Sequence, residues 1–411
     1  MLPQPPDFPP ALPLMLCGLA LAAPCAGATA ADTGMRIHAH AEAQLTEDPH
    51  ALHRLTLKIE GQTLQLRLRE NRALLDGLQP RPGTTSGALG RHYEGEIEGI
   101  EGSWLRLSWV DGHYAGAYFD GAELVLLDRA GAVTDSLGKG APASSDTLVA
   151  YRLRDVELPG LIDDVVGVPG YSLKSRPTRL SYAQFAQHLR PALGAEKLGG
   201  PVRQLRVTLV TDTEFSSVHG SNRDAVVASR INVVDGIYSD QFQTLIVIGE
   251  LRHLSDNGTL NTTVVSGSDS LLSRFRTFMT TGSGSSIPKG GLNHLISGKD
   301  FDGSTVGVAY LTVLCSSAFG YGINQVRAAN TTTALTIAHE MGHNFGASHD
   351  GQGGSVCESQ TGSWLMSPSL NGSSTFSPCA RASIEPRIQQ ATCLQPLSVP
   401  GAVFGNGFEV R

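Results

Sequence analysis

The sequence predicts two folded parts, a mostly β N-terminal half and an α/β C-terminal half that carries a histidine-rich helix. Short runs of alternating apolar and polar residues fill the first half. In the second half, continuous apolar strands alternate with helical patterns, and a histidine-rich helical motif follows them. With 411 residues, 41% of them hydrophobic, the chain can bury at least two cores.

The composition narrows the range of partners and compartments. The net charge is −7 and the chain has no basic run, so neither nucleic acid nor an anionic membrane is an expected partner. Charged residues make up only 17%, while Gly, Ser and Thr are plentiful, which is typical of extracellular β-rich or loop-rich proteins. We expect a secreted monomer.

Residues 11–30 are typical of a secretory signal peptide. An apolar run is followed by small residues and ends at Ala28-Thr29-Ala30, and it is too broken for a membrane span. The preceding residues contain Asp7 and no Lys or Arg, which departs from the usual positive start. We therefore expect a signal peptide over residues 1–30, and passage through the periplasm if the source is bacterial.

From residue 36 to 127 the alternating runs predict antiparallel strands over 55–59, 64–68, 104–109 and 114–119. Asp-Gly pairs at 111–112 and 120–121 supply turns between runs. A β-sandwich or barrel follows, and a carbohydrate- or protein-binding module is the less favoured alternative for the same strands. Residues 159–200 turn to Gly, Pro and scattered basic residues, which indicates a linker with a processing region, and we expect cleavage near 197–201.

The second half predicts an α/β fold. An apolar strand over 205–210 precedes a helix over 222–238, and a strand over 245–249 precedes a helix over 270–279. A third apolar run covers 306–311, and the histidine-rich helix comes after it.

That helix lies in residues 336–350, which read TIAHEMGHNFGASHD. His339 and His343 are four residues apart, so both imidazoles leave one helix face and can share a tetrahedral metal ion. Glu340 is placed to take a proton from a water that the ion acidifies. Gly346 can end the helix in a left-handed turn that brings His349 in as third ligand. The spacing and residue types predict Zn²⁺.

Chance and ordinary packing are poor explanations of this motif. His-Glu-x-x-His alone would occur by chance in roughly one sequence in a hundred, and a polar helix face would explain it. Adding the glycine, the third histidine and the aspartate lowers the chance to roughly a few in a million.

Four cysteines remain beyond the expected signal peptide: Cys315, Cys357, Cys379 and Cys393. An even number in an exported chain predicts two disulfides, and the residues alone leave three pairings open.

The full string His-Glu-x-x-His-x-x-Gly-x-x-His-Asp resembles the metzincin endopeptidase signature, and Asp350 makes it similar to the adamalysin (reprolysin, ADAM-type) branch. Residues 364–368, WLMSP, resemble the methionine turn of that family, with Met366 beneath the metal. Residues 92–119 are similar to a stretch of ADAM-type pro-domains. The resemblance covers about 203–394, and the first half more weakly.

The resemblance implies a metzincin catalytic domain, with a mixed twisted sheet and a zinc-binding helix, behind a mostly β pro-domain. It implies a zinc metalloendopeptidase made as a zymogen, in which the three histidines hold zinc and Glu340 is the general base. Protein or peptide substrates would pair as an extended strand with the sheet edge near 305–313. It also implies the disulfides Cys315–Cys393 and Cys357–Cys379.

The expected organisation is a signal peptide (1–30), a pro-domain with linker (31–198), a catalytic domain (199–394) and a tail (395–411). Two features depart from the family. No cysteine lies between Ala31 and Tyr310, so a thiolate cannot silence the zinc; Asp163 or Asp164 could do so, although solvated linker residues are the simpler interpretation. Arg206 stands where some relatives have a calcium-binding glutamate, so no calcium is expected.

Two rival interpretations remain. The chain could be a non-catalytic protein-binding module on a protease-like scaffold, but such a module has no need of Glu340. It could also be a zinc exopeptidase or a hydrolase of another amide, and an open edge strand favours cleavage within a chain.

Overall fold

The computed structural model describes residues 34–47, 54–78, 89–138, 140–157, 165–166, 202–326, 331–369 and 372–396. The expected signal peptide, Asp163 and Asp164, the expected cleavage region near 197–201 and all but the first two residues of the tail lie outside the described residues.

The first half forms a closed barrel of eight antiparallel strands, in which chain neighbours pair and the last strand returns to the first. The strands are β2 (Ala41–Glu47), β3 (Arg54–Ile59), β4 (Gln62–Glu70), β5 (Arg91–Ile97), β6 (Trp104–Val110), β7 (His113–Phe119), β8 (Leu124–Arg129) and β9 (Leu148–Arg152). Its interior is filled by leucines and other apolar residues from the alternating runs, such as Leu57, Leu66 and Leu107. The predicted β-rich half is confirmed, and of sandwich and barrel it is the barrel.

Short elements surround the barrel. A one-turn helix, η1 (Ala73–Leu75), follows β4; α1 (Ala130–Val133) and η2 (Thr134–Ser136) follow β8; η3 (Leu153–Asp155) follows β9. Two short strands, β1 (Arg36–Ile37) and β10 (Val156–Glu157), pair outside it.

The second half is built on a mixed sheet in the order β11-β15-β16-β14-β12-β13, with β17 beside β12. The strands are β11 (Val165–Val166), β12 (Arg203–Thr211), β13 (Thr244–His253), β14 (Leu292–Ser297), β15 (Gly307–Tyr310), β16 (Tyr321–Gln325) and β17 (Gln395–Pro396). Among the described strands of this sheet, two pairs are antiparallel, β15 with β16 and β17 with β12, and the other pairs are parallel. The predicted strands correspond to β12, β13 and β15, whereas β14 and β16 were not predicted.

The helices of this half are α3 (Thr213–His219), α4 (Arg223–Phe242), α5 (Leu271–Thr280), α6 (Thr333–Phe345) and α7 (Pro378–Gln390), with single turns η4 (Gly220–Asn222) and η5 (Gly258–Leu260). Within the described ranges, no helix is long and apolar enough to cross a membrane.

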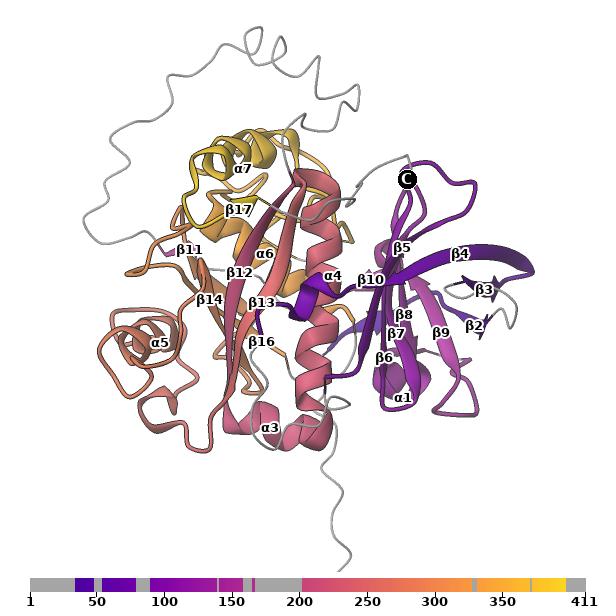
Figure 1. Cartoon of the computed structure of the whole chain (residues 1–411), viewed down its shortest axis with the longest axis horizontal. Helices are drawn as coiled ribbons and strands as arrows, with labels where there is room; N and C mark the ends of the chain where they lie inside the picture. The colour runs from indigo at the N-terminus through magenta and orange to yellow at the C-terminus, as the bar shows by residue number, and fades with distance from the viewer. Residues whose placement is uncertain are drawn as a thin grey trace, which may run out of the picture. The chain divides into compact units, whose positions relative to one another are not determined.

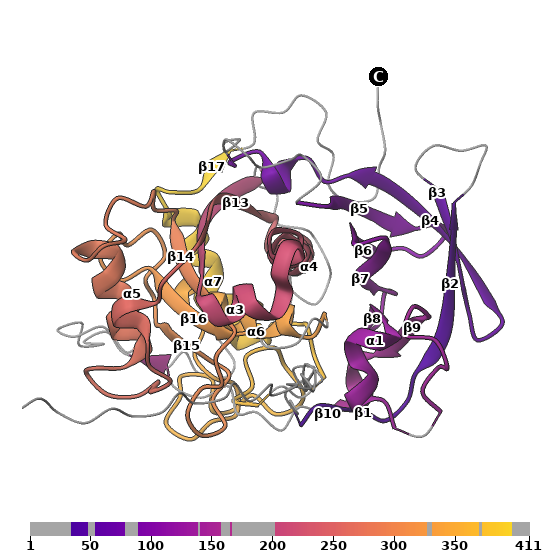
Figure 2. The same cartoon turned by 90° about the horizontal axis from the view of Figure 1, so that it is seen from below.

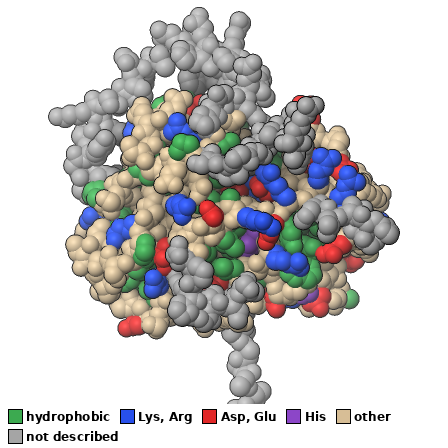
Figure 3. Space-filling model, viewed as in Figure 1, with side chains coloured by type: hydrophobic (Ala, Val, Ile, Leu, Met, Phe, Trp, Pro, Cys, Tyr) green, Lys and Arg blue, Asp and Glu red, His purple; other side chains and the backbone are tan. Residues whose placement is uncertain are grey.

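On the face drawn in Figure 3, acidic and basic side chains are interspersed rather than separated by sign.

Helix α4 is buried on both sides. Figures 1 and 2 show it between the sheet and the barrel, and it contacts β13 on one side and β6 on the other. Nearly every residue from Ala225 to Tyr238 is buried, so apolar positions surround the helix instead of forming one stripe. One hydrophobic cluster therefore runs from the sheet through α4 to the outer face of the barrel.

Gly236 marks the closest approach of α4 to the barrel. A Cβ there would lie 2.5 Å from the Trp104 ring and 2.8 Å from the Arg106 side chain. We expect Gly236→Ala to lower the free energy of unfolding by about 1–2 kcal/mol, because overpacking outweighs the gain in helix propensity. Urea unfolding measures this. The control is Gly138→Ala, where a Cβ meets nothing within 4 Å. Stabilisation by Gly236→Ala would contradict the close contact.

Candidate metal centre

Helix α6 and the turn after it place three imidazoles together. The helix ends at Gly346, which has φ 112° and donates its amide hydrogen to the carbonyls of Gly342 and His343. A residue without Cβ adopts this left-handed conformation at no steric cost. The chain then turns back along the helix, so that His349 faces His339 and His343.

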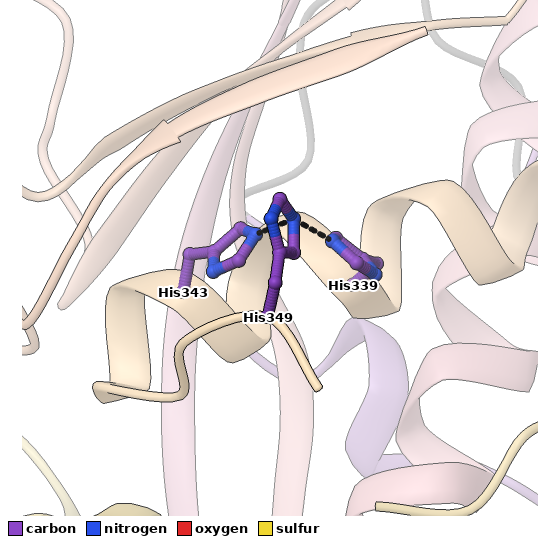
Figure 4. A group of neighbouring side chains, drawn as sticks. All are labelled: His339, His343 and His349. Atoms are coloured by element: carbon purple, nitrogen blue, oxygen red, sulfur yellow. Dashed lines mark hydrogen bonds between the residues drawn. The ribbon is translucent and has the colours of Figure 1, made fainter. Parts of the chain in front are cut away.

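The Nε2 atoms of the three histidines converge. His349 Nε2 lies 3.2 Å from His339 Nε2 and 3.1 Å from His343 Nε2, and all three side chains are buried (Figure 4). Two nitrogens bound to one tetrahedral zinc at about 2.0–2.1 Å would lie roughly 3.3 Å apart. The spacing in this chain therefore fits a zinc ion.

The other ring nitrogens fix the tautomers. Each Nδ1 lies within hydrogen-bond distance of an oxygen: His339 on Leu365 O at 2.6 Å, His343 on Ala347 O at 2.7 Å, and His349 on Gln352 Oε1 at 2.7 Å. A carbonyl oxygen can only accept, so each Nδ1 carries the proton and each Nε2 presents a lone pair. Three lone pairs aimed at one point repel one another unless a cation lies between them.

Burial keeps these imidazoles neutral. It lowers the pKa of His339 to about 3, with a further contribution from His349, and it lowers the pKa of His343 well below the usual value. Metal ligands must be unprotonated, so this environment favours metal binding at neutral pH.

Glu340 is a buried carboxylate beside this centre. Within the described parts of the chain, neither of its oxygens has a hydrogen-bond partner, and burial raises its pKa well above the usual value. The carboxylate lies against Gly307 of β15, where an added Cβ would collide with Oε1. A carboxylate kept without a protein partner is a strong proton acceptor facing the sheet edge.

Met366 lies under the helix. It is fully buried, and a Cβ on Gly342 would come within 2.5 Å of its sulfur. Its carbonyl accepts a hydrogen bond from the Asp350 amide at 2.8 Å. Asp350 also accepts a bond from the Ser377 hydroxyl at 2.6 Å, and burial raises its pKa to about 6. Asp350 thus ties the third histidine to the turn at Met366 and to the start of α7.

Comparison with known proteins agrees with this geometry. Residues 202–377 match the family model Reprolysin_5 of Metallo-peptidase family M12. The chain is 26% identical over 342 residues to snake venom metalloproteinase acutolysin-C of Deinagkistrodon acutus, which covers 79% of this chain and 75% of the relative. It is 26% identical over 270 residues to mouse disintegrin and metalloproteinase domain-containing protein 22, covering 63% of this chain and 27% of that one.

Residues 202–377 are therefore similar to reprolysin-type metallopeptidases, and this part is called the reprolysin-type domain below. The chain is also similar to brevilysin H2a, a zinc metalloproteinase-disintegrin-like protein of Gloydius brevicauda, with 39% identity over 95 residues and 22% of either chain covered. Metalloproteinase-II from Bacteroides fragilis matches with a TM-score of 0.47 and 13% identity, over 86% of this chain and 92% of that one. The predicted resemblance to the adamalysin/reprolysin family is confirmed, and the match to the M12 model supports a metal ion and protein or peptide substrates.

The disulfides of the reprolysin-type domain are the two that the resemblance implied. Cys357 bonds to Cys379, which links the loop after His349 to α7, and Cys315 bonds to Cys393. Cys315 lies in the connection between β15 and β16 rather than in a central strand, and Cys393 follows α7.

Sequence reasoning missed a buried polar group that holds α6 against the sheet. His294 on β14 donates from Nε2 to Asn344 Oδ1 at 2.9 Å and accepts at Nδ1 from Asn324 at 3.0 Å. Asn344 donates in turn to the carbonyls of Tyr310 and Tyr321. Two asparagines and a histidine inside apolar runs were the only sequence signal.

His294 gives the reprolysin-type domain a pH-dependent stability. Burial lowers its pKa from 6.5 to about 4, so between these values the unfolded state binds more protons and stability falls as the pH falls. The loss is on the order of 3 kcal/mol when complete. We expect the wild type to lose stability relative to His294→Gln as the pH drops from neutral to about 4, measured by urea unfolding of both proteins. A difference independent of pH would contradict the neutral buried imidazole.

Proposed function

We propose that the chain is a secreted, zinc-dependent metalloendopeptidase made as a zymogen. The observation that carries the proposal is the convergence of three Nε2 lone pairs beside the carboxylate of Glu340, which has no hydrogen-bond partner among the described residues and lies next to β15. Export is supported by the two disulfides and by the likeness to a snake venom protein. Residues 1–30 are its signal peptide, 31–198 its pro-domain and linker, 199–394 its catalytic domain and 395–411 its tail.

His339, His343 and His349 hold the zinc ion, and Met366 forms the floor under them. A bound zinc supplies a Lewis acid that polarises the scissile carbonyl and acidifies a water. Glu340 takes the proton of that water at its carboxylate and later passes it to the leaving amine. Burial raises the pKa of Glu340, which brings it closer to the pKa values of the water that loses the proton and of the amine that receives it. A smaller difference in pKa makes both proton transfers easier.

The substrate lies along β15. Gly307 to Tyr310 form the sheet strand nearest Glu340, and the side away from β16 can accept an extended peptide through its backbone groups. An added strand can continue in both directions past the metal, which favours cleavage within a chain over removal of a terminal residue.

The pairing of β15 with a segment from the first half supports the proposal that the chain is made as a zymogen. Val165 and Val166 form β11, which pairs in parallel with Ala309 and Tyr310 of β15. A substrate strand can take this position only after β11 leaves it. Latency therefore rests on occupation of the substrate edge; a zinc ligand from Asp163 or Asp164 remains a hypothesis, tested by replacing both with asparagine.

The catalytic assignment is tested on the full chain with site-specific protease sequences inserted on each side of β11, within 158–164 and within 176–200. After both cuts we expect about one zinc per chain and cleavage of casein and of an end-blocked peptide. Glu340→Gln should keep the zinc and lose roughly 10²-fold or more of kcat/KM, while His339→Ala loses both. The control is Glu358→Gln, an exposed carboxylate. Zinc binding without peptide cleavage in the wild type would refute the enzyme.

Latency is tested with the same chain. We expect the uncut protein to be at least about tenfold less active than the doubly cut one, since β11 must be displaced before a peptide can pair with β15. A cut on the C-terminal side alone leaves β11 tethered and should give intermediate activity. Equal activity of uncut and doubly cut protein would contradict the zymogen.

A further inference from the structure

The barrel has two hydrophobic faces, and only one of them fills its interior. Leu105, Leu107 and Val125 face inward. Trp104 of β6, Leu126 of β8 and Tyr151 of β9 belong instead to the cluster that includes α4, α6 and the turn at Met366. The outer face of β6, β8 and β9 is thus part of the core of the reprolysin-type domain, as in interfaces between permanently associated chains.

A buried ion pair fixes the barrel on α4. Arg106 of β6 donates from Nε to Asp235 at 2.9 Å and from a terminal nitrogen to Ser239 at 2.9 Å. The other oxygen of Asp235 accepts the amide hydrogen of Ile246 in β13 at 3.0 Å. The Arg106 and Asp235 side chains are 5% and 2% exposed. One carboxylate therefore joins barrel, helix and sheet.

A second pair of polar side chains extends this contact. Asn71, before η1, donates to Asn232 on α4 at 3.0 Å. Asn232 donates to the backbone carbonyl of Leu107 at 3.1 Å and lies within 3.3 Å of the Tyr93 carbonyl. Asn232 thereby satisfies barrel carbonyls that face α4.

The barrel also binds the residue that precedes the N-cap of the zinc helix. Thr332, at the start of α6, makes no side-chain cap bond of its own. Asp128 of β8 accepts the Thr331 amide hydrogen at 3.0 Å and the Thr331 hydroxyl at 2.7 Å. Arg230 of α4 donates to the Thr333 hydroxyl at 2.9 Å, which puts a buried cation at the positive end of the helix. The Asp128 carboxylate offsets that charge and the helix dipole together.

From these contacts we infer that the barrel is a permanent part of the active enzyme, bound without a covalent link after processing, and that activation removes only the segment on β15. Asp128 is a positioning residue: it acts on the metal centre through the start of α6. The inhibitory contact of β11 and the docking contacts of the barrel lie on different strands and helices, so one can be released while the other stays. This inference rests on the proposed processing of the chain, but its test measures association and does not depend on peptidase activity.

The doubly cut full chain tests the inference directly. On size-exclusion chromatography at low and at high salt, we expect the barrel and the C-terminal fragment to elute together and to stay together on dilution. Separate elution, with a C-terminal fragment that keeps its zinc and its fold, would overturn the inference. Joint elution of a protein that cleaves no peptide would refute the proposed enzyme and leave the association intact.

Variants identify which contacts hold the barrel. After both cuts, Asp128→Ala and Arg106→Ala should raise the dissociation constant of the two fragments at least tenfold, with Asp128→Asn between the wild type and Asp128→Ala. The control is Asp146→Ala, whose carboxylate is 65% exposed on the barrel. For Asp128→Ala we also expect a lower kcat with little change in KM. Wild-type association in both alanine variants would overturn the assignment; if they fail to fold, the cut wild type still decides.

Discussion

The backbone carbonyls of Leu365 and Ala347 hold the Nδ1 protons of His339 and His343, and this sets the direction of the lone pairs on which the metal centre depends. Two turns of the C-terminal half position those two carbonyls. Ala347 O is presented by the turn at Gly346. Leu365 O belongs to the turn at Met366, and Asp350 and the disulfide between Cys357 and Cys379 connect that segment to the rest.

The helix that carries two of the histidines is held at both ends by distant parts of the chain. Near its C-terminal end, Asn344 joins it to His294 on β14 and to the carbonyls of β15 and β16. At its N-terminal end, Asp128 of the barrel and Arg230 of α4 bind the threonines that begin it. The position of the barrel in the chain is that of a removable pro-domain. Its contact through Asp128, however, also helps to hold the start of α6 in place. In the zymogen that we propose, inhibition depends on a two-residue strand, β11, which pairs with β15.

The sequence predicted those features of the structure that depend on residues close together in the chain. The alternating strands of the barrel, the left-handed turn at Gly346 and the histidine spacing all follow from periods and side-chain chemistry within a few residues. Strands β14 and β16 were missed because Asn293, His294 and Asn324 are polar residues in a buried sheet, satisfied by partners far along the chain. The two-sided burial of α4 and the hydrogen bond from Thr331 to Asp128 could not be predicted either, since each depends on contacts about a hundred or more residues apart. The disulfide pairing came from family resemblance alone.

X-ray absorption at the zinc edge, on full-length protein loaded with one equivalent of zinc, would show directly whether the three histidines bind the ion. The account predicts a four-coordinate ion with three imidazole nitrogens and one further oxygen or nitrogen, all at about 2.0–2.1 Å. Sulfur ligands near about 2.3 Å, or a loosely held ion surrounded by water, would show that the converging lone pairs of His339, His343 and His349 are not the metal site.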